Sequence, residues 1–120
     1  MFKFLSLFLF ISLFLSACAT VPVTGRKQVS LVSNSELMSL SNQEYKQIIS
    51  TAQIEKGTKN AQMVTEVGQK IAKAVESFLT EINQKEKISE FAWEFNLIKD
   101  DKTVNAFCMP GGKIVVYTGI

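Results

Sequence analysis

The chain has 120 residues and no histidine, and this absence is its most restrictive feature. Without imidazole it cannot hold a Ser-His-Asp triad, a Cys-His pair or a zinc site with a histidine ligand. Two cysteines are too few for a disulfide framework or a four-cysteine metal site. Thirteen Lys and Arg against eleven Asp and Glu give a net charge of +2 over the whole chain, which gives no support to nucleic-acid binding or to a basic membrane-binding surface. We therefore expect no catalytic residue, no metal ligand and no nucleic-acid partner for this chain.

Residues 1–17 have the features of a bacterial signal peptide. Lys3 supplies the positive start, and an apolar run follows from Phe4 to Leu15. As a helix, these twelve residues span about 18 Å, well short of the ~30 Å hydrocarbon core of a bilayer. The run therefore fits a signal segment better than a membrane-spanning helix.

The signal segment ends at a cysteine, Cys18, after Leu15-Ser16-Ala17. This arrangement resembles a bacterial lipobox, which implies cleavage before Cys18, acylation of its thiol and a lipid anchor, followed by a tether over residues 18–32. Two or three acyl chains hold a protein firmly at a membrane. By the same analogy, Ala19 after the cysteine favours the outer membrane, facing the periplasm. The alternative is an ordinary secretory signal in which Cys18 is incidental.

Two amphipathic helices are predicted after the tether. Residues 33–36 match a capping box, with Ser33 as the cap and Glu36 three residues later, so the first helix runs from about 34 to 54. Asn60 can open the second. Its apolar stripe has spacings of three and four residues and consists of Val64, Val67, Ile71, Val75, Phe78 and Ile82. Gly68, beside this stripe, suits a close crossing with another helix.

Beyond residue 87 the apolar period changes from 3.6 to two. Phe91, Trp93, Phe95 and Leu97 alternate with less apolar residues, which predicts a half-buried strand. Residues 99–102 form a polar turn, and two further strands, 103–109 and 113–118, flank the turn Pro110-Gly111-Gly112. The predicted fold class is α+β, with two amphipathic helices followed by a three-stranded antiparallel meander.

The segment Asn105 to Gly119 carries a family resemblance. Its Asn-Ala-Phe…Pro-Gly-Gly hairpin resembles the strand-turn-strand before the active-site helix in HExxH zinc metallopeptidases related to the CAAX prenyl protease, specifically their bacterial periplasmic lipoprotein branch. The lipobox, the Pro-x-Thr-Gly-Arg element at 22–26 and Val-Gly-Gln-Lys-Ile-Ala at 67–72 occur in the order of that branch. The resemblance implies that residues 33–120 are the N-terminal part of a zincin-type peptidase domain, truncated before HExxH.

The resemblance implies a membrane-anchored zinc metalloendopeptidase that cleaves misfolded or unassembled envelope proteins. In the complete protein, zinc-bound water would be the nucleophile and the HExxH glutamate its general base. The zinc ligands are absent from this chain, which ends at Ile120, so we expect it to be inactive alone. Its partners would be envelope proteins or peptides, and the membrane through the anchor.

The same resemblance points to a strand that lines the active-site cleft and pairs with substrate backbone. Such pairing gives affinity with little side-chain selectivity. The residues at these positions are Gly112, Ile114, Val115, Val116 and Tyr117. Asn105 and Phe107 match positions near the cleft and are interpreted as scaffold.

Other chemically suggestive residues have simpler interpretations. Cys108 has no histidine to activate it and is predicted to pack as a small apolar side chain. Asp100 and Asp101 are adjacent carboxylates in a polar turn, where solvation is the ordinary outcome. Two functions without catalysis also stay open: an envelope lipoprotein with a binding or chaperone role, and an unrelated small structural lipoprotein.

Overall fold

A computed structural model describes residues 18–21 and 24–120, which fall into two units divided after Glu36. The predicted signal peptide, residues 1–17, lies outside the described residues. In the first unit β1 (Cys18–Thr20) pairs with β2 (Lys27–Val29) in an antiparallel ribbon. The segment predicted as a tether therefore contains a short hairpin. No helix of the described residues combines the length and apolarity needed to span a membrane.

The first helix, α2 (Asn34–Thr51), begins as its capping sequence predicts. The Glu36 amide donates to Ser33 Oγ over 3.2 Å, which satisfies one of the free amides of the first turn. The helix ends three residues before the predicted boundary, because the following residues form β3 (Ile54–Glu55) and Ile54 pairs with Ile98. A pairing partner distant in sequence thus overrides the local helical period.

The second helix, α3 (Lys59–Glu81), is capped by Thr58 and not by Asn60 as predicted. Thr58 Oγ1 accepts a hydrogen bond from the Ala61 amide over 3.2 Å. A β-hydroxyl in extended backbone one residue before the helix is the usual N-cap arrangement.

The predicted apolar stripe of α3 does not coincide with the face of the helix that is buried. The buried face consists of Gly68, Ala72 and Leu79, whereas Val67 and Ile71 are about half exposed. The reason is the close approach that Gly68 permits, since a Cβ there would lie 2.2 Å from Cδ1 of Phe95. Small side chains bring this face of the helix against the sheet, and not against another helix as predicted. Val67, Ile71 and Phe78 of the stripe are exposed, whereas its other residues are partly buried.

The sheet has four strands, in the order β3-β4-β6-β5. After the 3₁₀ helix η2 (Lys85–Glu90), β4 (Glu94–Ile98) runs parallel to β6 (Lys113–Tyr117), and β5 (Ala106–Met109) is antiparallel to β6. The α+β class is confirmed, but the antiparallel three-stranded meander is wrong. Alternation along a strand fixes which side chains share a face and leaves the order of strands open. Strand β6, which lies between β4 and β5, carries Val115, a residue with no exposed surface.

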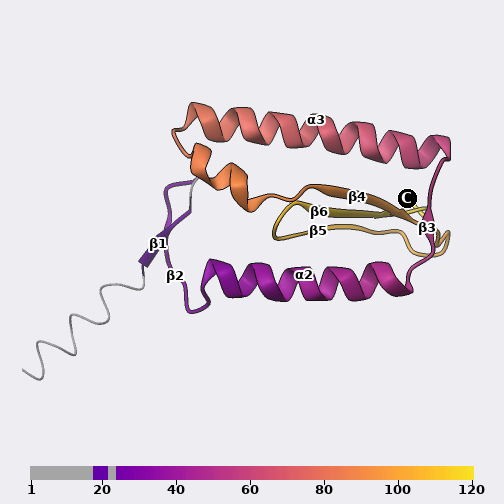
Figure 1. The fold of residues 1–120 in the computed structure, drawn as a ribbon, viewed down its shortest axis with the longest axis horizontal. Helices are drawn as coiled ribbons and strands as arrows, with labels where there is room; N and C mark the ends of the chain where they lie inside the picture. The colour runs from indigo at the N-terminus through magenta and orange to yellow at the C-terminus, as the bar shows by residue number, and fades with distance from the viewer. Residues whose placement is uncertain (1–17, 22–23) are drawn as a thin grey trace, which may run out of the picture. The chain divides into compact units, whose positions relative to one another are not determined.

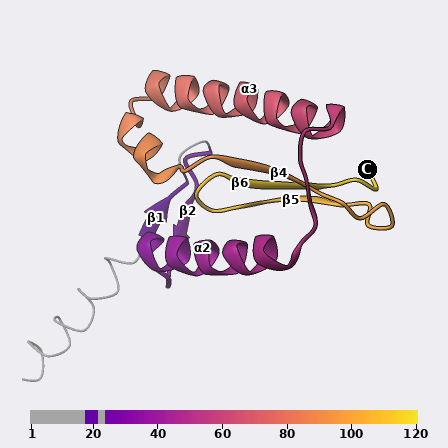
Figure 2. The ribbon, with the colours of Figure 1, turned by 45° about the vertical axis from the view of Figure 1, so that its right-hand side comes forward.

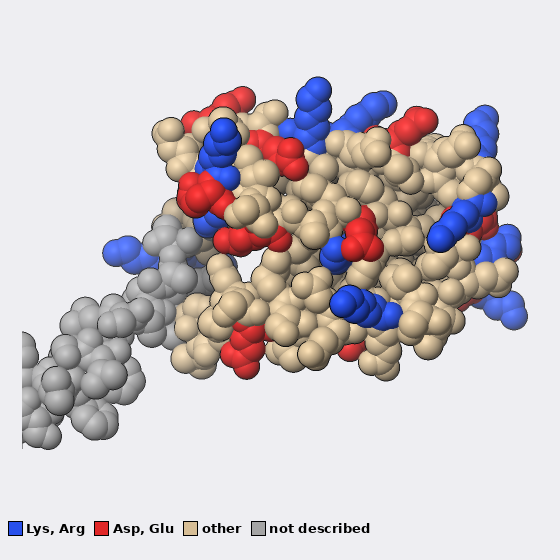
Figure 3. Space-filling model, in the orientation of Figure 1, with Lys and Arg blue, Asp and Glu red and all other residues tan. Residues whose placement is uncertain are grey.

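Within residues 37–120, α3 lies over one face of the sheet and α2 over the opposite face (Figures 1 and 2). The core cluster is on the α2 side and combines Tyr45 of α2 with Ile98 and Val115. Lys and Arg side chains lie among Asp and Glu side chains on the face of this unit that Figure 3 displays.

Candidate functional site

The hairpin that carries the family resemblance is built from β5, a glycine turn and β6. Met109 pairs with Lys113 across the turn, and Gly111 and Gly112 have φ of 88° and 79°, values that side chains disfavour. A Cβ on Gly112 would also lie 2.7 Å from Cε3 of Trp93. The two glycines therefore serve the turn geometry, and Gly112 also makes room for the indole.

The five candidates for substrate contact lie on or next to the inner strand β6. This strand has β4 on one side and β5 on the other, so its backbone groups are already paired. Among the described residues, no strand pairs with the outer edge of β5. Within this hairpin, the open edge is therefore that of β5 and not that of β6. That Ile114 to Tyr117 line a cleft stays a prediction.

The side chain of Lys113 is the buried charge of this hairpin, with 5% of its surface exposed. The parallel register places Glu94 directly beside it on β4. Lys113 Nζ donates to the Glu94 carboxylate and, over 2.6 Å, to the Ala92 carbonyl oxygen. It also lies 5.5 Å from the ring centre of Tyr45. The inward lysine at the start of β6 is thus satisfied by Glu94 of β4 and by the backbone just before that strand.

Tyr45 and Asn96 extend this pair into a network of four side chains. The Tyr45 hydroxyl donates to Glu94 Oε2 over 3.0 Å and accepts from Asn96 Nδ2 over 2.6 Å. The hydrogen bond from Lys113 holds the pKa of Glu94 below its usual range. Burial, followed by the hydrogen bond to Glu94, raises the pKa of Tyr45 to about 12.

At neutral pH the Glu94 carboxyl group is therefore ionised and the Tyr45 phenol is neutral. A carboxylate already bound to an ammonium is a weak base, so this arrangement favours a structural role over proton transfer. Sequence analysis missed the network, although one signal was present. With a period of two, Lys113 shares a face with Val115 and Tyr117, which places a charge on the core side of the strand.

The remaining side chains singled out from the sequence lie in two places. Asp100 accepts from Thr103 Oγ1 and Asp101 from Thr118 Oγ1, each over 2.6 Å, and these bonds lower the pKa of both carboxyl groups. They stabilise the turn after β4. Cys108 is exposed, which corrects the prediction that it packs in the core. On β5 it is the neighbouring position, Phe107, that packs against the core cluster.

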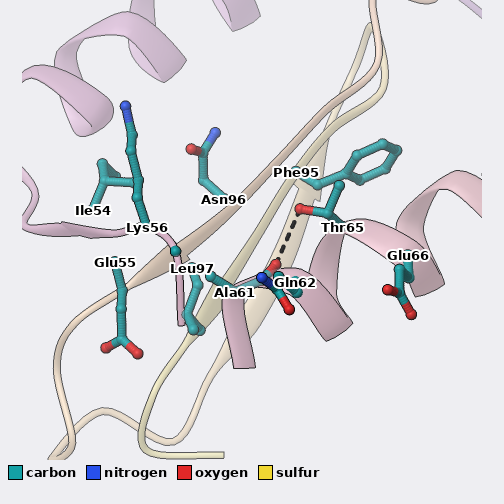
Figure 4. A pocket seen from close by; sticks show the side chains of 11 residues that line it. Ile54, Glu55, Lys56, Ala61, Gln62, Thr65, Glu66, Phe95, Asn96 and Leu97 are labelled. Carbon is teal, nitrogen blue, oxygen red and sulfur yellow. Dashed lines mark hydrogen bonds between the residues drawn. The ribbon is translucent and has the colours of Figure 1, made fainter. Parts of the chain in front are cut away.

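A separate hollow of about 390 Å³ lies between the start of α3 and strands β3 and β4. Figure 4 shows its lining, including Phe95, Asn96 and the hydroxyl of Thr65, which donates to the Ala61 carbonyl oxygen over 3.0 Å. None of the substrate-strand candidates lines this hollow. It lies away from the hairpin.

The residues present do not fit a zinc centre. The sequence has no histidine, and over residues 18–21 and 24–120 no three side chains of Cys, Asp or Glu gather closely enough to hold a metal ion. No catalytic step through zinc can be assigned to the side chains of this chain.

Comparison with known proteins matches the segment that contains the hairpin and most of α3 to a peptidase family. Residues 62–120 match the model of Peptidase family M48. The chain is also 32% identical over 114 residues to the mitochondrial metalloendopeptidase OMA1 of Bos taurus, an alignment that covers 93% of this chain and 20% of that protein. The chain thus spans about a fifth of the length of the curated relative it matches. No solved structure matches. Both matches support a relationship to the M48 metallopeptidases.

Proposed function

We propose that this chain is the N-terminal part of an M48 zinc metalloendopeptidase, held at the bacterial cell envelope through a lipid anchor on Cys18. The observation that carries the proposal is the family match over residues 62–120, which contains β4, β5, β6 and most of α3. The zinc ligands and the catalytic glutamate belong to an HExxH segment outside this chain, because the chain has no histidine.

The role we assign to this chain is to present the outer edge of β5 to substrate. The Tyr117 amide donates to the Asn105 carbonyl oxygen over 3.0 Å. Antiparallel alternation then directs the backbone groups of Ala106 and Cys108 away from β6. An extended peptide can pair with these groups whatever its side chains, which suits misfolded or unassembled envelope proteins as substrates.

The first experiment is to sequence the gene past the codon for Ile120. An open frame that reaches HExxH supports the peptidase. The complete protein should then cleave an unfolded protein substrate, and replacement of the HExxH glutamate by glutamine should abolish cleavage. A stop codon directly after Ile120 would overturn the peptidase and leave a binding lipoprotein, which the free edge of β5 favours.

The role of β5 has its own test in the complete protein. Cys108→Pro removes an outward amide from β5, whereas Cys108→Val keeps that amide and a side chain of similar size. We expect the proline variant to raise KM for an unfolded substrate by about tenfold. This is the effect of losing roughly one hydrogen bond between neutral groups, together with the alignment of the peptide that this bond provides. Equal KM values for the two variants would contradict substrate binding at β5 and leave the family assignment intact.

A further inference from the structure

The first unit combines exposed cations with exposed apolar side chains. Arg26 and Lys27 are exposed, and the sequence contains no acidic residue before Glu36. A few residues later, Leu31 is 91% exposed and Val32 is 47% exposed. Each Lys or Arg near an anionic membrane surface contributes about 1 kcal/mol of attraction, and exposed apolar side chains add to binding at the membrane interface.

The hairpin register places these side chains close to the proposed acylation site. Cys18 is opposite Val29, and Thr20 is opposite Lys27. At about 3.3 Å per extended residue, Lys27 lies roughly 7 Å along the ribbon from the level of Cys18, and Leu31 follows Val29 by a similar length of chain. Both are within about one Debye length, ~8 Å at physiological salt, of a membrane surface at Cys18.

Thr24, Gly25 and Arg26, the described part of the Pro-x-Thr-Gly-Arg element, lie in the turn of this hairpin. Gly25 has φ of 66° and its amide donates to the Val21 carbonyl oxygen, while the Val21 amide donates to the carbonyl oxygen of Arg26. These bonds close the ribbon so that Arg26 directly precedes β2, which begins at Lys27. The turn thereby keeps both cations within the length of the short ribbon that starts at Cys18.

We propose that residues 24–32 form a membrane-contact segment that binds anionic phospholipid headgroups beside the acylated Cys18. Arg26 and Lys27 contact the phosphates, and Leu31 and Val32 enter the interfacial region next to the acyl chains. The position of this segment beside the membrane rests on the lipid anchor of the proposed function. Its attraction to anionic lipid is independent of the anchor, because this attraction depends only on the charge and exposure of the segment.

The test uses vesicles of phosphatidylcholine with about one third phosphatidylglycerol, and vesicles of phosphatidylcholine alone. The processed, acylated protein carries an environment-sensitive fluorophore at Leu31→Cys in a Cys108→Ser background. The matched control carries it at Val104→Cys, because Val104 is also apolar and 77% exposed. We expect a blue shift of emission at position 31 in the anionic vesicles and none at position 104.

A second measurement removes the anchor. With Cys18→Ser in the mature chain, we expect Arg26→Gln and Lys27→Gln each to weaken sedimentation with anionic vesicles by about fivefold. The exposed α3 lysines provide the charge-matched control, and Lys70→Gln with Lys73→Gln should leave binding unchanged.

The outcomes separate the contact from the anchor. If the acylated protein sediments with vesicles but the fluorophore gives the same emission at positions 31 and 104, the membrane contact is contradicted and the lipid anchor is supported. Equal binding of the Cys18→Ser protein and its Arg26→Gln, Lys27→Gln form overturns the headgroup contact. A protein that binds anionic vesicles through these cations, but is never acylated, supports the contact and contradicts the anchor.

Discussion

Removal of the Glu94 carboxylate should destabilise the fold more than removal of the Lys113 ammonium that it binds. The two partners are unequally buried: 5% of the Lys113 side chain is exposed, against 51% of the Glu94 side chain. If Lys113 is replaced, water can solvate the Glu94 carboxylate that is left. If Glu94 is neutralised, the ammonium stays buried beside the Ala92 carbonyl oxygen without its counter-charge.

The magnitude follows from this asymmetry. A fully buried charge that loses its partner costs about 3–5 kcal/mol. Here the lost partner is half exposed and already screened by water, and Glu94→Gln retains an acceptor for the lysine, so we expect a loss of about 2 kcal/mol. Lys113→Met removes the charge and keeps an unbranched side chain, so it should cost between about 0 and 1 kcal/mol. The double variant should match Lys113→Met alone.

Urea unfolding of the four proteins, followed by circular dichroism, measures these free energies, with Glu90→Gln as an exposed control. The reasoning would be refuted if Lys113→Met cost as much as Glu94→Gln, or if the two losses added. The pKa of Glu94 is lowered in the fold, so its contribution is complete above the ordinary carboxyl pKa and is lost as pH falls through the folded value. The gap between wild type and Glu94→Gln should therefore narrow in acid.

Three further predictions concern the stability of the fold after single substitutions. The pKa of Tyr45 is raised from 10.0 to about 12, so its contribution is complete below pH 10 and lost as pH rises toward 12. Between pH 10 and pH 12 the free energy of unfolding, measured in urea, should therefore fall by about 2 kcal/mol more for wild type than for Tyr45→Phe. Gly68→Ala should lower the thermal midpoint despite the better helix propensity of alanine, since its Cβ would meet the ring of Phe95; a raised midpoint would show that the ring can move away. Thr58→Ala should cost about 1 kcal/mol in urea unfolding, and Thr58→Ser, which keeps the cap, close to nothing.

The features that could be predicted from the sequence are those decided by neighbouring residues. The cap at Ser33 and the turn at Gly111 and Gly112 depend on hydrogen bonds and dihedral angles within a few positions, and the structure confirms them. The helical period of α3 also sufficed to place a long helix. The features that could not be predicted are those decided by distant partners.

The side of α3 that packs on the sheet illustrates this limit. Apolar size favoured Val67 and Ile71 as core residues, but the small residues Gly68 and Ala72 are the buried ones, and Gly68 lies against the ring of Phe95. Packing complementarity to Phe95 decided the orientation, and no period in the helix itself contains that information. The parallel pairing of β4 with β6 is hidden for the same reason, since it joins strands separated by β5.

The buried lysine connects these distant pairings to the proposed function. Edge strands bind peptides well when the strands behind them are rigid, because a mobile template loses entropy on binding. Behind β5, the fold fixes β6 to β4 through Lys113 and Glu94, and fixes β4 to α2 through Tyr45. A charge placed inward at the start of β6 costs stability unless its partner strand is in register, so it also disfavours a slipped pairing. If β5 is the substrate edge, the network holds its supporting strand in one register, and variants that loosen the network should weaken peptide binding without touching the peptide.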